Sequence, residues 1–559
     1  MAATLEVAIT GVEGKAYENI LSRLRIYRLS QLDEQPDYLE VKRLHRLAPQ
    51  DIEAALAPYG YHSVQVESDL IATENGWRAS YDVEPGRQVY ITDVSITVIG
   101  AGKDALATTD GQTITALRVG DPLNHPLYEQ EKSRLLRELR ALGFLSAAFQ
   151  VQNIKVNRAD HSAGIELLLD TGPAFRFGEI ISDQDVIDED LFSRFISFES
   201  GDRFDSSILP GLQRDLYRTG FFQRVSVIPD ISDENGSYVP VIIVAEPSES
   251  VTNVSLGVGY ATDTSFNIRL DYQNRLLNRS GHSAFSSLLL GDQRSMVQLN
   301  YRVPGPDPLH TAFTGTGGWN RELWEDTETE KFSAGISYGY DNSPHFRTLS
   351  LQFFNEDYQI GATSETGRFL MPGLSGSWAR ADALVNTSRG GRVTLEIEGA
   401  SSELLSDATF AKLRLSGRAI ISPLQKWRLI GRSSVGTIIV DTIDEIPPSL
   451  RFYAGGEKSV RGYKYKTLGP QDSTGTIVGG RVLLTGSISL ERQVLEFGRV
   501  SAFFDIGNAM DDWDVDLVRG VGVGIGLALP FGQIKLDFAY PLDDEGTAQY
   551  VYLRVGTDL

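Results

Sequence analysis

Residues 521–540 read VGVGIGLALPFGQIKLDFAY, and this stretch decides the fold. From Val521 to Leu529 large aliphatic residues alternate with glycine or alanine, and from Ile534 to Tyr540 apolar residues alternate with charged or small ones. A period of two places alternate side chains on opposite faces of a β-strand. One apolar face and one small or charged face are typical of a membrane barrel, with lipid outside and water inside.

The same alternation continues through the whole region from Glu249 to Leu559. Counted back from the C-terminus it predicts sixteen strands, an even number as in single-chain outer-membrane barrels. We therefore expect a 16-stranded transmembrane antiparallel β-barrel, whose lumen holds water unless something plugs it. The predicted strands lie at 251–261, 264–275, 280–290, 293–303, 309–322, 330–341, 347–359, 371–380, 391–403, 408–422, 427–441, 478–492, 499–507, 518–529, 532–541 and 549–559.

The composition agrees with this fold. The mean hydropathy is negative, and no run of about 18 apolar residues offers a transmembrane helix. A net charge of −22 argues against nucleic acid as a partner, because phosphate binding relies on clustered Lys and Arg. Cysteine is absent, which excludes disulfides and thiol chemistry. Residues 1–9 show no secretory signal peptide, so we expect a mature chain whose signal has been replaced by a start methionine.

Residues 1–248 contain a threefold repeat. A helical stretch ends in a glycine followed by an aromatic residue at Gly60, Gly143 and Gly220. Glycine at such a site suits a left-handed helix C-cap before a strand. Each copy closes with a strand and a turn signal, so we predict three small β-α-α-β-β modules of α+β type in front of the barrel. The expected domains are 1–86, 87–172, 173–248 and the barrel at 249–559.

The longest connection of the predicted barrel runs from about Val440 to about Val478, and its aromatic, glycine-rich sequence indicates an ordered segment. Strand parity directs Glu491 and Asp505, on neighbouring strands, into the lumen. Two inward carboxylates need a cation, and a guanidinium from the loop can bind them with charge-assisted hydrogen bonds. Arg461 is the candidate. Its ion pairs would either fix a static plug or form a switch that is released during the working cycle.

Several groups of residues resemble a known family. The tetrad Val460-Arg461-Gly462-Tyr463, the strand Phe503–Gly507 and the repeats before a 16-strand barrel are together similar to the BamA-like outer-membrane assembly superfamily. Three repeats instead of five, with the segments Arg451–Gly456 and Ile534–Ala539, look most like its translocation and assembly module (TamA) branch. The resemblance covers the whole chain.

The resemblance implies a location in a bacterial outer membrane, with the repeats as periplasmic POTRA domains. Arg461, Gly462 and Tyr463 would form a lumenal loop anchor in which Arg461 binds Glu491 and Asp505. The first repeat would dock a TamB-like, elongated protein that is anchored in the inner membrane. Clients would be outer-membrane proteins or autotransporters, and outer-membrane lipids would be further partners.

Catalysis and metal binding have little support in the sequence. Residues Gly335–Gly339 match the G-x-S-x-G pattern of a nucleophile elbow, but the elbow needs a strand-to-helix turn, and these residues alternate along a predicted strand. The seven histidines are scattered without ligand spacing. We therefore expect a protein that is not an enzyme and that has no cofactor and no metal site.

Three functions remain open. An assembly factor would use the lateral seam between the first and last strands, where Gly257, Gly259 and Gly556 weaken packing and would let client strands join. A secretion pore would pass an unfolded chain through the lumen, although two-partner translocators of this superfamily typically carry two repeats behind a plug helix. A lipid route would continue a conduit from the inner membrane and deliver phospholipid. The sequence does not separate the first of these functions from the third.

Overall fold

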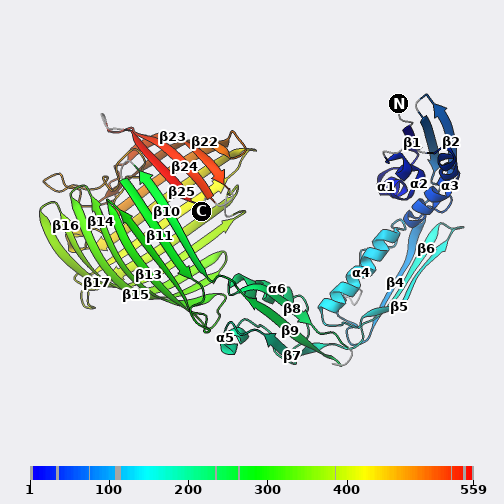
Figure 1. Cartoon of the computed structure of the whole chain (residues 1–559), viewed down its shortest axis with the longest axis horizontal. Coiled ribbons are helices and arrows are strands. Elements are labelled where there is room, and N and C mark those ends of the chain that lie inside the picture. Colours follow the sequence, from blue (N-terminus) through cyan, green and yellow to red (C-terminus); the bar gives the residue numbers. More distant parts are fainter. Residues whose placement is uncertain are drawn as a thin grey trace. The chain divides into compact units, whose positions relative to one another are not determined.

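The computed structural model describes residues 4–32, 37–74, 76–107, 115–232, 236–261, 265–383, 386–529, 532–544 and 549–556. The chain forms two compact units (Figure 1). The first comprises Met1–Asp183, Phe198–Gln213 and Ser226–Val244, and the second comprises Gln184–Ser197, Arg214–Val225 and Ala245–Leu559. Two short segments of the third predicted repeat therefore belong to the same unit as the C-terminal strands.

The first unit begins with a mixed three-stranded sheet of order β1-β3-β2. Apolar residues recur along α3 at helical spacing, and Val41, Leu44 and Ile52 are buried in one cluster with Tyr81 and Val83 of β3. This sheet and its helices therefore have a core of their own. The elements are β1 Thr4–Thr10, α1 Gly14–Arg23, α2 Arg25–Ser30, α3 Tyr38–Leu56, the 3-10 helix η1 Ala57–Tyr59, β2 Gln65–Thr73 and β3 Gly76–Glu84.

Two further three-stranded sheets follow, of order β4-β6-β5 and β7-β9-β8. In all three sheets the strand that opens the module pairs in parallel with the strand that closes it. The predicted glycine caps are confirmed, because Gly60, Gly143 and Gly220 have φ values of 83°, 85° and 71°. The elements are β4 Tyr90–Ile99, α4 His125–Ala141, β5 Ala148–Asn157, β6 Ser162–Asp170, β7 Arg176–Asp183, α5 Glu189–Ser193, α6 Leu209–Arg218, β8 Phe222–Pro229 and β9 Tyr238–Pro247.

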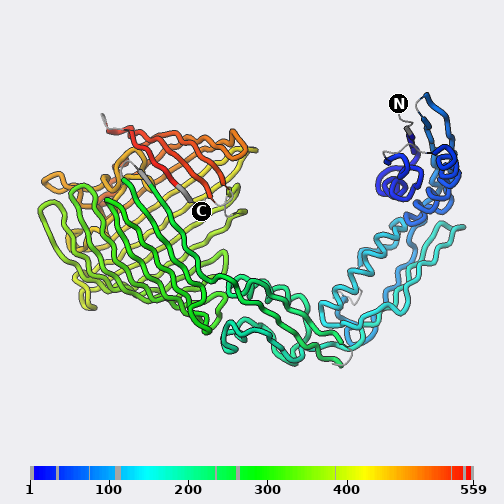
Figure 2. Tube along the Cα trace, in the orientation of Figure 1, coloured from blue at the N-terminus to red at the C-terminus, as the bar shows by residue number. Residues whose placement is uncertain are grey.

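The C-terminal strands β10 to β25 form a 16-stranded barrel in sequence order, which confirms the predicted fold class. The last strand, β25, lies beside the first, β10 (Figures 1 and 2). The strands are β10 Thr252–Ala261, β11 Ser265–Asn274, β12 Ser283–Gly291, β13 Arg294–Pro304, β14 Thr311–Trp324, β15 Thr327–Asn342, β16 His345–Ile360, β17 Thr363–Ala381, β18 Gly390–Ala400, β19 Phe410–Ile421, β20 Trp427–Val440, β21 Val482–Gln493, β22 Gly498–Met510, β23 Val518–Leu529, β24 Gly532–Pro541 and β25 Tyr550–Gly556, with the 3-10 helix η3 Ile443–Glu445 after β20.

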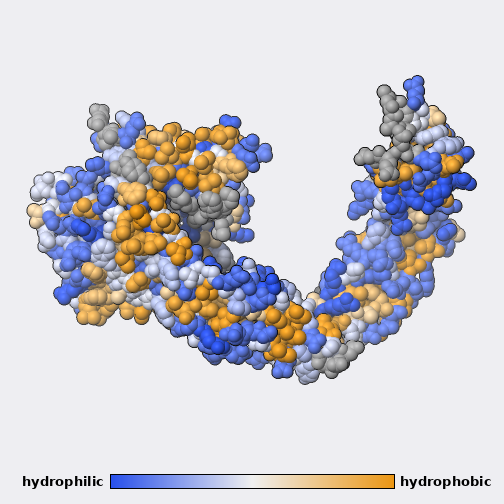
Figure 3. Space-filling view, in the orientation of Figure 1, coloured by the Kyte–Doolittle hydropathy of each residue, from blue (hydrophilic) through white to orange (hydrophobic). Residues whose placement is uncertain are grey.

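The two faces of the barrel differ as the alternation predicts. Outward side chains such as Leu256, Ile336 and Ile525 are exposed, and Figure 3 shows hydrophobic side chains gathered over the outside of the barrel. Inward residues such as Glu491 and Asp505 are charged and buried. An apolar outer face of this kind is suited to lipid. None of the described helices is both long and apolar enough to cross a membrane.

Residues 184–197 pack against the turns between barrel strands. The N–H of Asp188 donates to the carbonyl of Arg279 at 2.8 Å, and its carboxylate accepts a hydrogen bond from Ser280 Oγ at 3.0 Å. Arg194 Nη1 donates to the carbonyl oxygen of Gly305 at 2.9 Å. These contacts fasten α5 to two successive turns at the end of the barrel from which β10 starts.

Candidate functional site

Residues 441–481, called the inner loop below, connect β20 to β21. The base of the loop is apolar: Leu450 and Phe452 are buried in one cluster with inward side chains of the barrel, among them Phe354. Phe452 and Gly480 exchange two backbone hydrogen bonds of 2.9 and 2.8 Å, which close the base. The long connection is therefore ordered and packed against the wall, as its composition indicates.

Arg461 projects from the inner loop and is 3% exposed. Its guanidinium binds Asp505 of β22 through two hydrogen bonds, from Nε to Oδ2 at 2.7 Å and from Nη2 to Oδ1 at 2.8 Å. Its Nη1 donates to Oδ2 of Asp537 on β24 at 2.9 Å. The Cζ atom lies 3.4 Å from the ring centroid of Phe503. Two carboxylates and an aromatic face together use the planar fork of arginine, which lysine lacks.

The glycine face of the stretch around residues 521–540 makes room for this anchor. A Cβ on Gly520 would lie 2.0 Å from the carbonyl oxygen of Arg461. A Cβ on Gly524 would lie 2.2 Å from Oδ1 of Asp537. These contacts explain why the inward positions of β23 are small: the loop and its carboxylate partner occupy the space that side chains would fill.

The structure corrects one predicted partner of Arg461. Glu491 faces the lumen as predicted and is 3% exposed. Within the described part of the chain, however, its carboxylate pairs with Arg428 Nη2 at 2.7 Å and with Lys535 Nζ at 2.8 Å rather than with Arg461. The second carboxylate that Arg461 binds is Asp537.

Strand register explains the correction. Asp505 pairs with Ser487 across β21 and β22, whereas Glu491 pairs with Ser501. Four residues along a strand separate the two inward positions by about 13 Å. One guanidinium cannot bridge that distance, so Glu491 takes its cations from neighbouring strands instead.

The rest of the tetrad connects the inner loop to the last strand. The N–H of Gly462 donates to the hydroxyl of Tyr552 at 3.4 Å, and that hydroxyl donates to the carbonyl of Tyr463 at 3.3 Å. Gly462 has a φ of 98°, and a Cβ there would lie 2.8 Å from the backbone of β24. Arg554 of β25 forms an ion pair with Glu457 of the loop. The inner loop therefore holds β25 from inside the barrel.

Sequence reasoning missed a second anchor, at the other side of the loop. Lys466 Nζ forms an ion pair with Oε2 of Glu322 at 3.0 Å and lies 3.7 Å from the ring centroid of Trp324. The hydroxyl of Tyr465 donates to Oε1 of Glu322 at 2.6 Å. Glu322 and Trp324 belong to β14, which lies opposite β22 in the order of strands around the barrel. The inner loop thus spans the lumen between two walls.

The backbone of Lys466 adopts a conformation that is unusual for a residue with a side chain. Its φ of 58° lies in the left-handed region, which costs a residue with a side chain free energy unless its contacts hold it there. In the sequence, Lys464-Tyr465-Lys466 looks like an ordinary polar turn, so no signal separates the buried lysine from an exposed one.

We expect Lys466→Met to loosen this end of the inner loop. Methionine keeps an apolar stem on Trp324 but leaves the Glu322 carboxylate without a cation, a loss of about 1–3 kcal/mol. Trypsin should then cleave after Lys458 faster than in the wild type. Lys464→Met is the matched control, because its ion pair with Glu325 is 56% and 42% exposed and contributes little. Equal cleavage of Lys466→Met and the wild type would contradict the second anchor.

The seam between β10 and β25 is short. Within the described residues the two strands pair at Ala261 and Tyr552, while residues 252–260 pair with β11 alone. On its other side, β25 pairs with β24 along all seven of its residues. The edge of β10 that faces the seam is therefore largely without a strand partner in the described part of the barrel.

The predicted seam glycines lie on these two strands. Gly257 and Gly259 occupy inward positions of β10, and a Cβ on Gly259 would come within 2.8 Å of the Asn267 side chain. Gly556 pairs with β24, so β25 is regular up to this residue. A kink at Gly556, which the absence of a side chain would permit, would turn residues 557–559 into the lumen, and those residues lie outside the described part of the chain.

The pattern that looks like a nucleophile elbow has no elbow geometry. Gly335–Gly339 lies inside β15 and pairs with β14 and β16 over its whole length. Among the described residues, no group of three or more His, Asp or Glu side chains could hold a metal ion. The buried charged side chains of this site instead form the two loop anchors, at Arg461 and Lys466, and the ion pairs of Glu491.

Known proteins share these features. The Omp85 superfamily domain matches residues 254–558, and the POTRA domain described as TamA domain 1 matches residues 6–85. The outer membrane protein assembly factor BamA of Nitratidesulfovibrio vulgaris is 21% identical over 381 residues, which are 64% of this chain and 47% of BamA. This chain thus spans about half the length of that relative.

A solved structure shows the same fold. BamA from Haemophilus ducreyi lacking POTRA domains 1–3 matches with a TM-score of 0.69 and 14% identity, over 84% of this chain and 100% of that one. The Omp85 match covers more than half of the chain and runs from β10 to β25. The chain therefore belongs to the Omp85 superfamily of non-enzymatic outer-membrane proteins, with its barrel in the outer membrane and its POTRA domains in the periplasm.

Proposed function

We propose that this protein is a TamA-type assembly factor. Together with a TamB-like partner anchored in the inner membrane, it would insert or translocate β-barrel and autotransporter-type proteins through the seam between β10 and β25. The observation that carries the proposal is the short seam, which pairs at Ala261 and Tyr552 within the described residues. An unpaired strand edge is a template for another strand.

The contacts of the inner loop with β25 support the proposal that opening of the seam is controlled. Tyr552 takes part in the seam pair and also contacts Gly462 and Tyr463 of the loop. If Arg461 left its two carboxylates, β25 would lose its inner support at the same time. We therefore favour the interpretation of the Arg461 ion pairs as a switch. A loop anchored on two opposite walls also argues against a permanently open secretion pore.

Crosslinking in cells distinguishes client insertion from the lipid route. A photoreactive amino acid at Leu256, which is exposed on the outer face of β10, should trap unfolded outer-membrane clients. The same probe at Leu395, exposed on β18 away from the seam, should trap lipid alone. Lipid without client at both positions would contradict the proposal and favour the lipid conduit.

We propose four domains, at 1–86, 87–172, 173–248 and 249–559, with the first as the docking site of the inner-membrane partner. Deletion of residues 1–86 removes a sheet that has its own core, so the remaining chain should fold and reach the membrane. A terminal module of such an array contacts only one neighbour and is free to bind a partner. We expect the shortened chain to lose co-purification with the partner. Retained co-purification at wild-type yield would refute the assignment.

A further inference from the structure

A cleft of about 390 Å³ lies on the outer face of the barrel, where β15 ends and β16 begins. Alternation along the two strands places its lining on the face that carries Ile336 and Leu349, which are 67% and 61% exposed. The cleft therefore faces lipid rather than the lumen. Its lining residues are Tyr338, Tyr340, Asn342, His345 and Arg347.

The cleft lies at the periplasmic boundary of the membrane. Adjacent strands of the barrel are antiparallel, so every second strand from β10 starts at the end that follows the periplasmic repeats, and β16 is one of them. Exposed aromatic residues near strand ends form the girdles that mark the boundary between lipid and water. Such outward residues near this end are Tyr272, Tyr301, Tyr338, Tyr340 and Trp378, which are between 36% and 45% exposed. The cleft is thus at the depth of lipid headgroups.

The charge of Arg347 has no partner on this face. Across the sheet Arg347 lies opposite Tyr340 on one side and Gly376 on the other. In the described part of the chain its guanidinium forms no ion pair and donates no hydrogen bond. Arg321, which also points outward but lies near the opposite end of the barrel, pairs with Glu328 at 2.6 Å. A guanidinium without a partner at a lipid face keeps its donors for an anion.

The neighbours of Arg347 are held in place and leave room for a ligand. The ring of Tyr338 packs on that of Phe313, with centroids 4.9 Å apart. Asn342 Nδ2 donates to the hydroxyl of Tyr340 at 3.3 Å, and that hydroxyl can donate its own hydrogen to an anion. A Cβ on Gly376 would meet no atom within 4 Å, so the surface beside the arginine is open. Groups that are already positioned lose less conformational freedom on binding.

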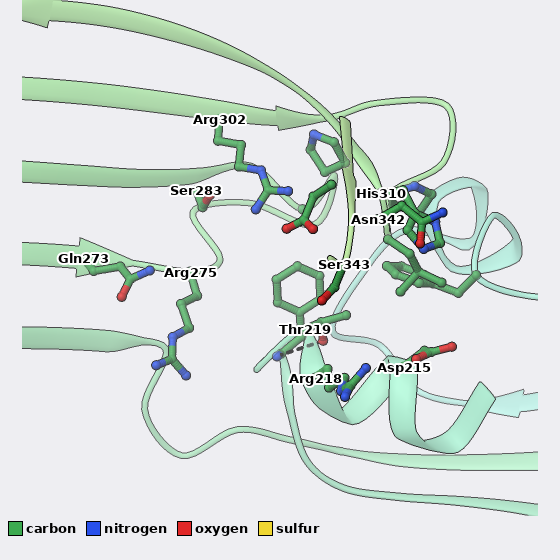
Figure 4. Close-up of a pocket in the computed structure, with 17 residues that line it drawn as sticks. Asp215, Arg218, Thr219, Gln273, Arg275, Ser283, Arg302, His310, Asn342 and Ser343 are labelled. Carbon is green, nitrogen blue, oxygen red and sulfur yellow. Dashed lines mark hydrogen bonds between the residues drawn. The ribbon is translucent and has the colours of Figure 1, made fainter. Parts of the chain in front are cut away.

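The lumen side of the same end of the barrel also carries arginines, in a second cleft of about 730 Å³ (Figure 4). Arg302 of β13 lines this second cleft. Alternation turns Arg302 inward, because Tyr301 before it faces outward. A guanidinium at this position faces the water of the lumen and cannot contact a headgroup in the surrounding bilayer. Arg302 is therefore a matched control for Arg347.

We propose that the outer cleft binds the phosphate of a phospholipid headgroup in the periplasmic leaflet. Arg347 donates charge-assisted hydrogen bonds to the phosphate oxygens, and the hydroxyl of Tyr340 is a further donor. The acyl chains lie along the apolar surface that Ile336 and Leu349 continue toward the membrane core. Because the cleft opens to the bilayer, the phosphate nearest to it is that of a lipid. The site goes beyond the proposed function, since it requires neither a client nor an open seam.

The test measures binding of the first molecule of dioleoyl phosphatidylglycerol to the full-length protein in detergent, by native mass spectrometry. We expect Arg347→Gln to bind this lipid at least about tenfold more weakly, because one hydrogen bond to a charged group is worth roughly that factor. The side chain is exposed on the outer face, so the barrel should still fold. Arg347→Lys keeps the charge but lacks the planar fork. It should show a smaller loss, and it serves as the test if Arg347→Gln does not fold.

The controls separate the sources of the phosphate and the two faces of the wall. Arg302→Gln removes the same charge from the lumen side and should bind phosphatidylglycerol like the wild type. Binding of diacylglycerol with the same acyl chains should not depend on Arg347. Inorganic phosphate should fail to displace the lipid at equal concentration. Unchanged binding by the Arg347 variants, an equal loss in Arg302→Gln, an equal loss for diacylglycerol, or displacement by phosphate would overturn the proposal.

Discussion

Arg461→Ala should release the inner loop and increase the ion conductance of the barrel in planar bilayers. Removing one partner of a buried ion pair costs about 3–5 kcal/mol, and here it would leave Asp505 and Asp537, 0% and 2% exposed, without their cation. The next cations are Arg432, 4.0 Å from Asp505, and Lys535, 3.9 Å from Asp537. Because about 1.4 kcal/mol corresponds to a factor of ten, a loss of this size should raise the population of the released loop by roughly a hundredfold to a few thousandfold.

Protease sensitivity provides an independent measurement for the same variant. Trypsin should cleave after Lys458 in folded Arg461→Ala and spare the wild type. Arg461→Lys should rescue poorly, since one ammonium cannot bridge two carboxylates and stack on Phe503. Wild-type conductance, protease resistance and activity in Arg461→Ala would together count against the anchor.

Two carboxylate variants test the corrected partner set. Asp537→Asn should raise conductance, because Asp537 receives Nη1 of Arg461. Glu491→Gln should leave conductance close to that of the wild type, because Glu491 pairs with Arg428 and Lys535 instead. If Glu491→Gln raised the conductance and Asp537→Asn did not, Glu491 would be the partner of Arg461, as predicted from the sequence.

The barrel could be predicted from the sequence because lipid and water impose a period of two on each strand. This alternation of apolar and polar residues is lost where a strand extends beyond the membrane. The predicted strand at 371–380 is β17, Thr363–Ala381, and its first residues, such as Thr363 and Glu365, are polar on both faces. They remain in the sheet because β16 continues beside them and supplies backbone partners.

The anchor could be predicted only in part. The alternation of side chains along each strand predicts that Asp505 and Glu491 face the lumen, but it does not predict how far apart they lie along the barrel. That distance depends on the register between strands, which the turns and the loop set together. Asp537 lies within residues 521–540, yet nothing in the sequence of its strand indicates that a loop from another part of the chain would contact it. Lys466 was missed for the same reason.

Cysteines across the seam should lock the barrel and stop client insertion. Extending the register from Ala261 and Tyr552 places residue 258 opposite 555 and residue 260 opposite 553. These two pairs of positions lie beyond the one seam pair of the described structure, but in a closed seam their Cα atoms would be about 4.5–5.5 Å apart, within reach of a disulfide, so oxidation would trap the closed barrel. The chain has no native cysteine. No other thiol can therefore form a disulfide with the pairs Val258→Cys with Val555→Cys and Tyr260→Cys with Leu553→Cys. Oxidation should abolish insertion of clients by the purified protein in liposomes, and a reductant should restore it.

A disulfide between β24 and β25 is the matched control. Leu536 and Leu553 are paired in that register, so Leu536→Cys with Leu553→Cys adds the same bond to the last strand without crossing the seam. The inner loop keeps its contacts with Tyr552 in both locked barrels, and a difference between them therefore reports on the seam itself. If the barrel locked across the seam still inserts clients at the normal rate, lateral opening is not the mechanism. The function must then depend on the lumen or on the periplasmic repeats.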